Sequence, residues 1–244
     1  MTKLSVNLNK FALLRNARGI NFPNVIHMGE KCILAGTHGI TVHPRPDQRH
    51  IKRSDVYELS SFLTDFPEIE FNIEGYPMPD FLAMVAQVKP HQCTLVPDKP
   101  EQLTSDHGWD LSKEGEQLQP IISDLKQAGI RVSLFMDREL KQIELTKAIG
   151  ADRIELYTGP YARAFISRKT KTILANYKRA ANKAQEIGLG VNAGHDLNLQ
   201  NIALFCSIPD ILEVSIGHAI VVESFDFGLE QTIKKYLRIL NSRN

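Results

Sequence analysis

The chain has 244 residues, of which 43% are hydrophobic and 23% are charged, and its formal net charge is +1. This composition is typical of a globular protein and excludes a disordered, collagen-like or coiled-coil chain. No run of like charges is long enough for a nucleic-acid arm, and no apolar stretch is long enough for a membrane span. The N-terminus also lacks a signal-peptide pattern, so we expect a cytoplasmic protein without a nucleic-acid or membrane partner.

Eight short apolar or β-branched runs predict eight strands. They are LSVNL (4–8), GITVH (39–43), EFNIE (70–74), QCTLV (92–96), RVSLF (131–135), RIELY (153–157), LGVNA (189–193) and ILEVS (211–215). Between most of them lie stretches with helical spacing, at 55–63, 79–88, 114–128, 140–149, 169–187 and 229–240. Glycines at the helix-to-strand joints, among them Gly129 and Gly188, predict helix ends and short crossover connections.

The alternation of strands and helices predicts a parallel sheet. Eight units in 244 residues leave about 30 residues for each, which fits one (β/α)₈ TIM barrel domain over residues 1–244. An open doubly wound sheet is the alternative, but no dinucleotide fingerprint or Walker-type loop follows a predicted strand. Long loops are expected over 97–112 and 158–167, at the barrel end where active sites are built.

Polar side chains stand at or just after the C-terminal ends of the predicted strands, where a barrel can bring them together. They are Asn7, Asn9, His43, Arg45, His50, Glu74, Lys99, Thr104, Glu155, Tyr157, Asn192, His195, Asp196, Ser215 and His218. A single histidine or carboxylate there is more often structural than catalytic, but six equivalent strand ends favour a shared site. His38 and His91 precede strands, so we expect them at the opposite, stabilising end of the barrel.

Two Gly-His segments, NAGHD at 192–196 and SIGHA at 215–219, follow the seventh and eighth predicted strands. Glycine lets backbone N–H groups approach an anion, and a helix that follows presents its positive N-terminal end. The segments around Gly194 and Gly217 therefore predict a phosphorylated small-molecule ligand. Arg18 and Arg45 add positive charge, and with His50 they suit a second phosphate.

The sequence does not predict a metal site. The first strand ends in VNLN, without the His-x-His of metal-dependent hydrolase barrels, and no H-E-x-x-H occurs. The three cysteines, Cys32, Cys93 and Cys206, have no metal-binding spacing and are each expected to be small buried hydrophobic residues. Acid–base chemistry by histidine and glutamate, without a metal, is therefore favoured.

Eight segments, in order and over essentially the whole chain, resemble the pyridoxine 5′-phosphate synthase family. They are VNLNKFALLRNARG (6–19), GITVHPRPDQRHI (39–51), FNIEGYP (71–77), CTLVPDKPEQLTSDHGWDL (93–111), GIRVSLFMD (129–137), IELYTGPYA (154–162), LGVNAGHDL (189–197) and SIGHAIV (215–221). The resemblance implies a (β/α)₈ barrel with extra helices. It further implies the condensation of 3-amino-2-oxopropyl phosphate with 1-deoxy-D-xylulose 5-phosphate to pyridoxine 5′-phosphate, phosphate and water, with no cofactor.

The resemblance also implies roles for single residues and an assembly. His43 and Glu74 match proton acceptors, His195 matches the proton donor, and Glu155 matches a carboxylate that stabilises the transition state. The matched contacts of the two substrates are Asn7, Arg18, Gly217 and His218 for the amino-oxopropyl phosphate, Arg45, His50 and Thr104 for the deoxyxylulose phosphate, and Asp196 through its backbone N–H. The family is a homo-octamer built from dimers, in which the arginine matching Arg18 reaches a neighbouring subunit's site.

Three places depart from the family pattern. Asn9 and Lys10 stand where many members have Asp-His, Asp196 stands where glycine is common, and Ser215 replaces an asparagine. Two alternatives stay open: another phosphosugar-converting barrel, such as an isomerase or aldolase, and a phosphate-ligand-binding barrel without catalysis. No predicted strand ends in lysine, which disfavours a Schiff-base aldolase. The predicted surface helices show no apolar stripe beyond what packing on a barrel requires, so the sequence itself indicates no interface.

Overall fold

Eight parallel strands close into a barrel, and β8 pairs with β1. The computed structural model describes residues 1–98, 105–167 and 169–242. The strands are β1 (Lys3–Asn7), β2 (Gly39–Val42), β3 (Glu70–Gly75), β4 (Gln92–Leu95), β5 (Arg131–Met136), β6 (Arg153–Tyr157), β7 (Gly190–Gly194) and β8 (Ile211–Ile216). They follow one another around the barrel in sequence order, which confirms the predicted (β/α)₈ fold.

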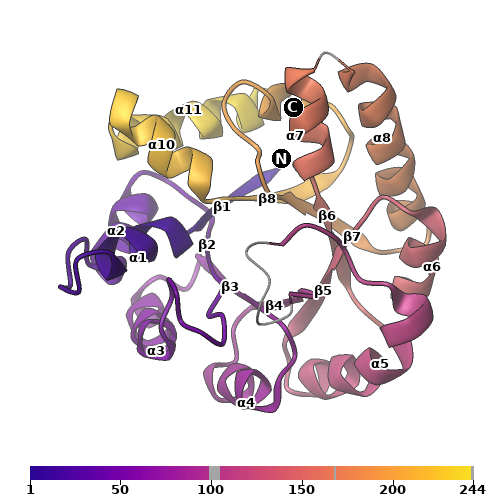
Figure 1. Ribbon diagram of the computed structural model, residues 1–244, viewed down its shortest axis with the longest axis horizontal. Coiled ribbons are helices and arrows are strands. Elements are labelled where there is room, and N and C mark those ends of the chain that lie inside the picture. The colour runs from indigo at the N-terminus through magenta and orange to yellow at the C-terminus, as the bar shows by residue number, and fades with distance from the viewer. Residues whose placement is uncertain (99–104, 168, 243–244) are drawn as a thin grey trace.

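Helices surround the strands on the outside of the barrel (Figure 1). They are α1 (Asn9–Asn16), α2 (Val25–Leu34), α3 (Arg53–Phe62) with a 3₁₀ turn η1 (Leu63–Asp65), α4 (Pro79–Val88), α5 (Leu111–Gln127), α6 (Leu140–Ala148), α7 (Gly159–Ile166), α8 (Thr170–Glu186), α9 (Ile202–Phe205), α10 (His218–Phe227) and α11 (Leu229–Asn241). Two helices follow β1, β6 and β8, which confirms the expected extra helices. None of the helices in the described part of the chain is long and apolar enough to cross a membrane.

Local sequence signals predict most element ends but not every helix. Positive φ angles of 81° at Gly129 and 77° at Gly188 confirm two predicted helix ends. The long loop predicted over 158–167 is wrong, because α7 occupies it: a proline stands in its first turn, and Tyr161 packs against Phe165 one turn later. Asn9, predicted at the end of the first strand, instead begins α1. The loop predicted over 97–112 lies partly outside the described residues.

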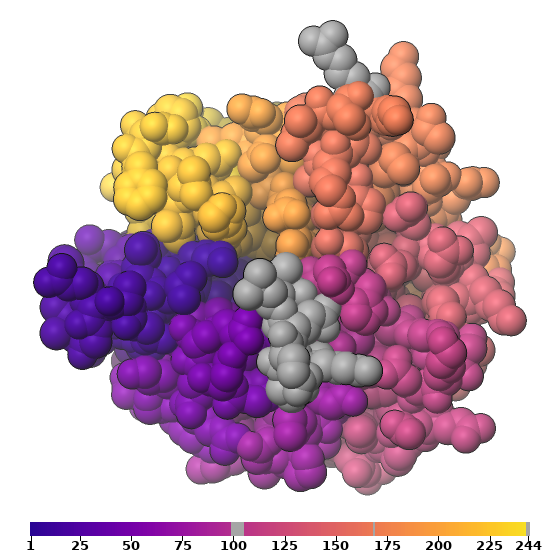
Figure 2. All heavy atoms as spheres, viewed as in Figure 1, coloured from indigo at the N-terminus to yellow at the C-terminus, as the bar shows by residue number. Residues whose placement is uncertain are grey.

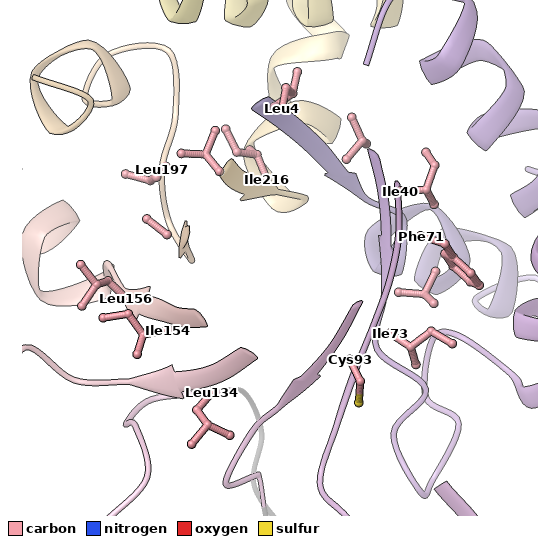
Figure 3. Packing of buried hydrophobic residues seen from close by; sticks show 14 of the residues in the cluster. Leu4, Ile40, Phe71, Ile73, Cys93, Leu134, Ile154, Leu156, Leu197 and Ile216 are labelled. Carbon is pink, nitrogen blue, oxygen red and sulfur yellow. The ribbon is translucent and has the colours of Figure 1, made fainter. Parts of the chain in front are cut away.

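The main hydrophobic core lies between the barrel and its helices. Side chains such as Leu4, Phe71 and Leu134 point from the strands toward the surrounding helices (Figure 3). Cys32 and Cys93 are buried there as predicted. The prediction is wrong for Cys206, which is only partly buried because it directly follows the short helix α9 near the surface.

The inside of the barrel is mostly polar, although barrels are commonly filled with bulky branched residues. The hydroxyl groups of Ser5 and Thr41 lie 2.7 Å apart. Asn72 Nδ2 donates to Thr41 Oγ1 at 3.4 Å, and Asn72 Oδ1 accepts from Thr94 Oγ1 at 3.0 Å. All four residues are buried. Successive strands therefore present hydrogen-bonded polar side chains to the barrel axis, beneath the strand ends that carry the site.

Two histidines hold the N-terminal end of the barrel, as predicted. His38 Nδ1 accepts a hydrogen bond from the Leu4 N–H at 3.1 Å. His91 Nδ1 accepts one from the Phe71 N–H at 3.0 Å. Each ring thereby satisfies a backbone donor of a neighbouring strand, which is a structural function far from the C-terminal strand ends.

Candidate active site

A histidine and a glutamate meet at the C-terminal ends of β2 and β3. His43 Nδ1 lies 3.9 Å from Glu74 Oε2, and Asn7 Nδ2 on β1 donates to the same oxygen at 3.4 Å. His43 is 5% exposed and Glu74 is 8% exposed. Neighbouring parallel strands end side by side, so the barrel brings together three residues that the sequence places far apart.

Burial gives this pair unusual protonation properties. Burial, reinforced by repulsion from Arg45 and Arg49, lowers the pKa of His43 to about 3. The imidazole is therefore neutral near pH 7 and able to accept a proton. Burial also raises the pKa of Glu74 well above its ordinary 4.5, and the Glu155 carboxyl adds to the effect. Glu74 thus keeps a proton to a higher pH than an exposed glutamate does.

Asn9, one of the departures from the family pattern, positions His43. Its Oδ1 accepts a hydrogen bond from the His43 backbone N–H at 2.9 Å. Its own N–H donates to Asn7 Oδ1 at 3.0 Å. Asn9 therefore holds His43 in place through its backbone N–H. The sequence does not predict this function, since the contact joins α1 to the end of β2 and depends on how the helix packs.

Glu155 projects from β6 against the backbone of β7. A Cβ atom on Gly194 would overlap Glu155 Oε1, so a residue other than glycine at this position would force the Glu155 carboxyl to move. The sequence predicts an anion-binding function for Gly194, and the structure adds the accommodation of this carboxyl. Burial, with the negative charge of Glu213, raises the pKa of Glu155 to about 8. A second carboxyl of the site therefore tends to keep its proton at neutral pH.

His195 and Asp196 adopt a strained backbone. Their φ angles are 82° and 60°, in the left-handed region that residues other than glycine rarely occupy. Thr158 Oγ1 donates to the carbonyl oxygens of Gly194, at 2.6 Å, and of His195, while Asn201 Nδ2 donates to the Asp196 carbonyl at 3.1 Å. Such strain costs of order 1–3 kcal/mol per residue and is typical of functional sites, which supports the predicted importance of this segment.

The two Gly-His segments lead into different structures. Helix α10 begins at His218, directly after β8, so the predicted helix N-terminus at the barrel mouth is confirmed there. A Cβ on Gly217 would lie 3.0 Å from the Asn7 carbonyl oxygen, which shows how closely this turn passes the end of β1. After β7 the prediction is wrong: the next helix, α9, begins only at Ile202, because the strained segment at His195 comes first.

Arg45 and His50 lie on the segment that follows β2. Arg45 is buried, and its Nη1 lies 2.6 Å from Asp98 Oδ2. The ring of His50 packs edge-on against that of His43, with centroids 6.2 Å apart. Burial, with repulsion from His43 and Arg45, lowers the pKa of His50 to about 3, so the ring is neutral and can offer a phosphate a hydrogen bond but no charge. Asp98 was missed from the sequence, although it lies three residues after the end of β4.

The structure does not bring Arg18 into the mouth of its own barrel. Arg18 lies on the exposed turn after α1, and no described hydrogen bond or ion pair joins its guanidinium to the site residues. Arg15 on the same helix is instead buried and paired with Asp55. A cavity of about 310 Å³, partly lined by Gly19 and Arg15, lies beside this turn and outside the mouth. Thr104 and Lys99 lie outside the described residues.

An apolar wall borders one side of the site. Val96, Phe135 and Tyr157 form a small buried cluster at the ends of β4, β5 and β6. The Phe135 and Tyr157 ring centroids are 5.5 Å apart, and the Tyr157 ring lies edge-on to His195 at 5.1 Å. Such a wall offers van der Waals contact to the apolar face of a small ring beside a histidine. Its members were missed as a group because their proximity arises from barrel closure.

The strand ends therefore carry a neutral imidazole, two carboxyls of raised pKa and the N-terminus of α10 within one barrel mouth. Within the described residues, no three His, Cys, Asp or Glu side chains are grouped to hold a metal ion. A buried imidazole beside carboxyls of raised pKa, at the C-terminal strand ends of a (β/α)₈ barrel, is typical of barrel enzymes that use acid–base chemistry.

The chain belongs to the family described as pyridoxal phosphate biosynthesis protein PdxJ, whose model matches residues 4–242. A "Pyridoxine 5'-phosphate synthase" of Xylella fastidiosa (strain M23) is 50% identical over 251 residues, covering 100% of this chain and 96% of that protein. One of Xanthomonas campestris pv. campestris (strain B100) is 52% identical over 247 residues, covering 98% of this chain and 96% of that protein.

A solved structure of phosphoribosyl anthranilate isomerase from Thermotoga maritima superposes on the chain with a TM-score of 0.62. The match covers 99% of this chain and 100% of the isomerase, at 12% sequence identity. At that identity the likeness concerns the fold alone, which agrees with the closed barrel described above.

Proposed function

We propose that this chain condenses 3-amino-2-oxopropyl phosphate with 1-deoxy-D-xylulose 5-phosphate to pyridoxine 5′-phosphate, phosphate and water. Membership of the family and full-length relatives of about 50% identity that bear the synthase name support this activity. The structural observation that carries it is the buried pair of His43 and Glu74, 3.9 Å apart at neighbouring strand ends. Imine formation, dehydration and ring closure each move protons, and this pair supplies a base beside an acid.

The protonation states suggest how the site residues divide the work. Neutral His43 accepts the first proton, since its lowered pKa leaves the ring uncharged. Glu74, whose pKa burial raises, becomes an acceptor once a cationic imine lies beside it, because a nearby positive charge lowers a carboxyl pKa. His195, on its strained segment, returns a proton to a leaving oxygen. Glu155 stabilises charge that develops at the floor of the mouth.

Two ends of the mouth suit the two phosphate groups. The N-terminus of α10 at Gly217 and His218, beside Asn7, suits the amino-oxopropyl phosphate, since the first N–H groups of a helix have no partner within the helix and favour an anion. Arg45 and His50 on the segment after β2 suit the deoxyxylulose phosphate. Asp196 contributes its backbone N–H. Hydrogen bonding to His195 lowers the pKa of the Asp196 side chain, and the resulting carboxylate repels a phosphate from that side chain.

We further propose the homo-octamer built from dimers, with Arg18 acting in a neighbouring chain's mouth. Apolar side chains are exposed on α1 and its following turn and on α10, with Phe22 76% and Phe225 78% exposed. Helices α1 and α10 are neighbours, at the indigo and yellow surfaces of Figure 2. The sequence by itself does not indicate this surface, because its exposed apolar side chains come from segments that are far apart in the chain. Sedimentation that detects only monomers would refute the assembly. The cytoplasmic location of the protein stays a prediction.

The alternative of a Schiff-base aldolase finds little support. No lysine is among the buried polar residues of the described chain, and such an enzyme needs a desolvated lysine at its site. A barrel that only binds phosphate esters has no use for a neutral imidazole beside a carboxyl of raised pKa. We therefore retain the synthase as the one function that uses all of these groups.

The test is an incubation of the purified protein with both phosphorylated substrates, in which pyridoxine 5′-phosphate and free phosphate are measured in parallel. We expect equal amounts of both products, and a loss of at least about 10²-fold in Glu74→Gln and His195→Asn. His91→Gln changes a histidine at the opposite end of the barrel and serves as the matched control with unchanged turnover. Tight binding of either substrate without product would instead identify a binding barrel.

A further inference from the structure

Three buried polar side chains form a row across β6, β7 and β8 below the site. The strand register pairs Glu155 with Asn192, and Asn192 with Glu213. Their exposed fractions are 4%, 2% and 3%. Residues in register on adjacent parallel strands point to the same face of a sheet, so all three side chains face the barrel axis. Glu213 lies one strand further than Asn192 from Glu155, and the family match assigns it no role.

The amide in the middle of the row has a defined orientation. Asn192 Oδ1 accepts from Arg153 Nη1 at 3.2 Å, and a guanidinium can only donate. The Asn192 Nδ2 therefore points the other way and donates to Glu213 Oε1 at 3.3 Å. The Asn192 amide N–H that Glu213 accepts, and the Arg153 guanidinium on the other side of Asn192, both favour a negatively charged Glu213.

The charges around Glu213 come from the lower half of the barrel. Arg153 on β6, Arg131 on β5 and Lys3 on β1 favour its ionised form. Burial and the carboxylate of Glu70 on β3 oppose it, and burial raises the pKa of Glu213 to about 7. Lys3 and Arg131 are themselves ion-paired with Glu70, at 2.8 and 2.6 Å, so the direct contact that Glu213 receives is the Asn192 amide.

Glu155 has the opposite surroundings. Burial is the first cause of its raised pKa and the Glu213 carboxyl is the second, and Glu155 in turn raises the pKa of Glu74 at the end of β3. Two negative charges in one buried row repel each other strongly, so only one of Glu155 and Glu213 ionises readily near neutral pH. The Asn192 amide, which donates to Glu213 and is oriented by Arg153, places the charge on Glu213.

We propose that Glu213 is a positioning residue that holds the negative charge of the Glu155–Glu213 pair and thereby keeps Glu155 protonated as a hydrogen-bond donor. A neutral carboxylic acid in an apolar or buried site can donate to an oxygen that becomes negative in a transition state. Glu155 then stabilises a developing oxyanion rather than a cation. The kinetic consequence rests on the proposed function, whereas the protonation state of Glu155 does not.

The test is Glu213→Gln, which removes the charge and keeps the shape. Without that charge Glu155 ionises more easily, so infrared titration of its carboxyl band should move to lower pH by on the order of one unit. The band is identified by its loss in Glu155→Gln. The basic limb of the pH profile of kcat/KM for the condensation should move in the same direction. Glu144→Gln, which removes a surface carboxylate of α6, should change neither.

Asn192→Leu is a second variant in case Glu213→Gln does not fold. It removes the amide donor that favours charge on Glu213, so the Glu155 band should again move to lower pH. An unchanged Glu155 titration in a folded variant overturns the proposal, whatever happens to activity. A shifted titration supports the charge assignment, and if wild-type protein then makes no pyridoxine 5′-phosphate, it is the proposed function that has failed.

Discussion

Arg15 joins α1 to the start of α3 through a buried ion pair, and its loss should destabilise the protein strongly. Arg15 is 6% exposed and Asp55 is 5% exposed. Arg15 Nη2 donates to Asp55 Oδ2 at 2.9 Å and to the His50 carbonyl oxygen at 3.1 Å. Asp55 also accepts the Lys52 backbone N–H at 2.7 Å, which completes the first turn of α3. Arg15→Met keeps much of the side-chain volume but leaves the Asp55 charge buried without its cation.

Removing one partner of a buried pair costs about 3–5 kcal/mol, because the remaining charge stays desolvated. A protein of this size loses roughly 2–4 °C in Tm per kcal/mol, so we expect Tm to fall by between about 6 and 20 °C. Scanning calorimetry at fixed protein concentration measures the change. The double variant Arg15→Met/Asp55→Leu removes both charges and should lie closer to wild type than the sum of the single variants predicts.

A Tm of Arg15→Met within about 2 °C of wild type would show that the pair does not stabilise the fold in the way described. Strict additivity in the double variant would contradict the reasoning as well, since it would mean that the two side chains do not interact. Because the pair also holds the His50 carbonyl, KM for the deoxyxylulose phosphate should rise in Arg15→Met more than kcat falls.

Two further predictions concern the site and the assembly. In Gly194→Ala the new Cβ displaces the Glu155 carboxyl, so kcat/KM should fall at least about 10²-fold with only a small change in Tm. The control is Gly115→Ala, whose Cβ meets ordinary contacts and which should retain activity. Normal turnover of Gly194→Ala would contradict the geometry. If Arg18 acts across subunits, mixing and reassociating inactive Arg18→Ala and His195→Asn chains should restore about a quarter of wild-type activity, because about half of the dimers are mixed and each mixed dimer has one intact site out of two. No recovery after demonstrated exchange would show that Arg18 works within its own chain.

Local patterns in the sequence determine the fold of this protein. Strand runs, helical spacing and glycine stops are properties of a few neighbouring residues, so they predict the eight strands and the barrel that closes them. They also predict which end of the barrel a residue occupies: His43 and Glu74 follow their strands and meet at the mouth, while His38 and His91 precede theirs and hold the opposite end.

Only the tertiary structure decides which of these residues touch and what charge they carry. Asn9 meets the His43 backbone because α1 packs beside the end of β2, and Glu155 fills the space left by Gly194 because β6 and β7 pair in a particular register. Burial then sets the pKa values, and burial is a property of the closed barrel that no short segment contains. The row that ends at Glu213 exists for the same reason: strands distant in the chain become neighbours only when the sheet closes.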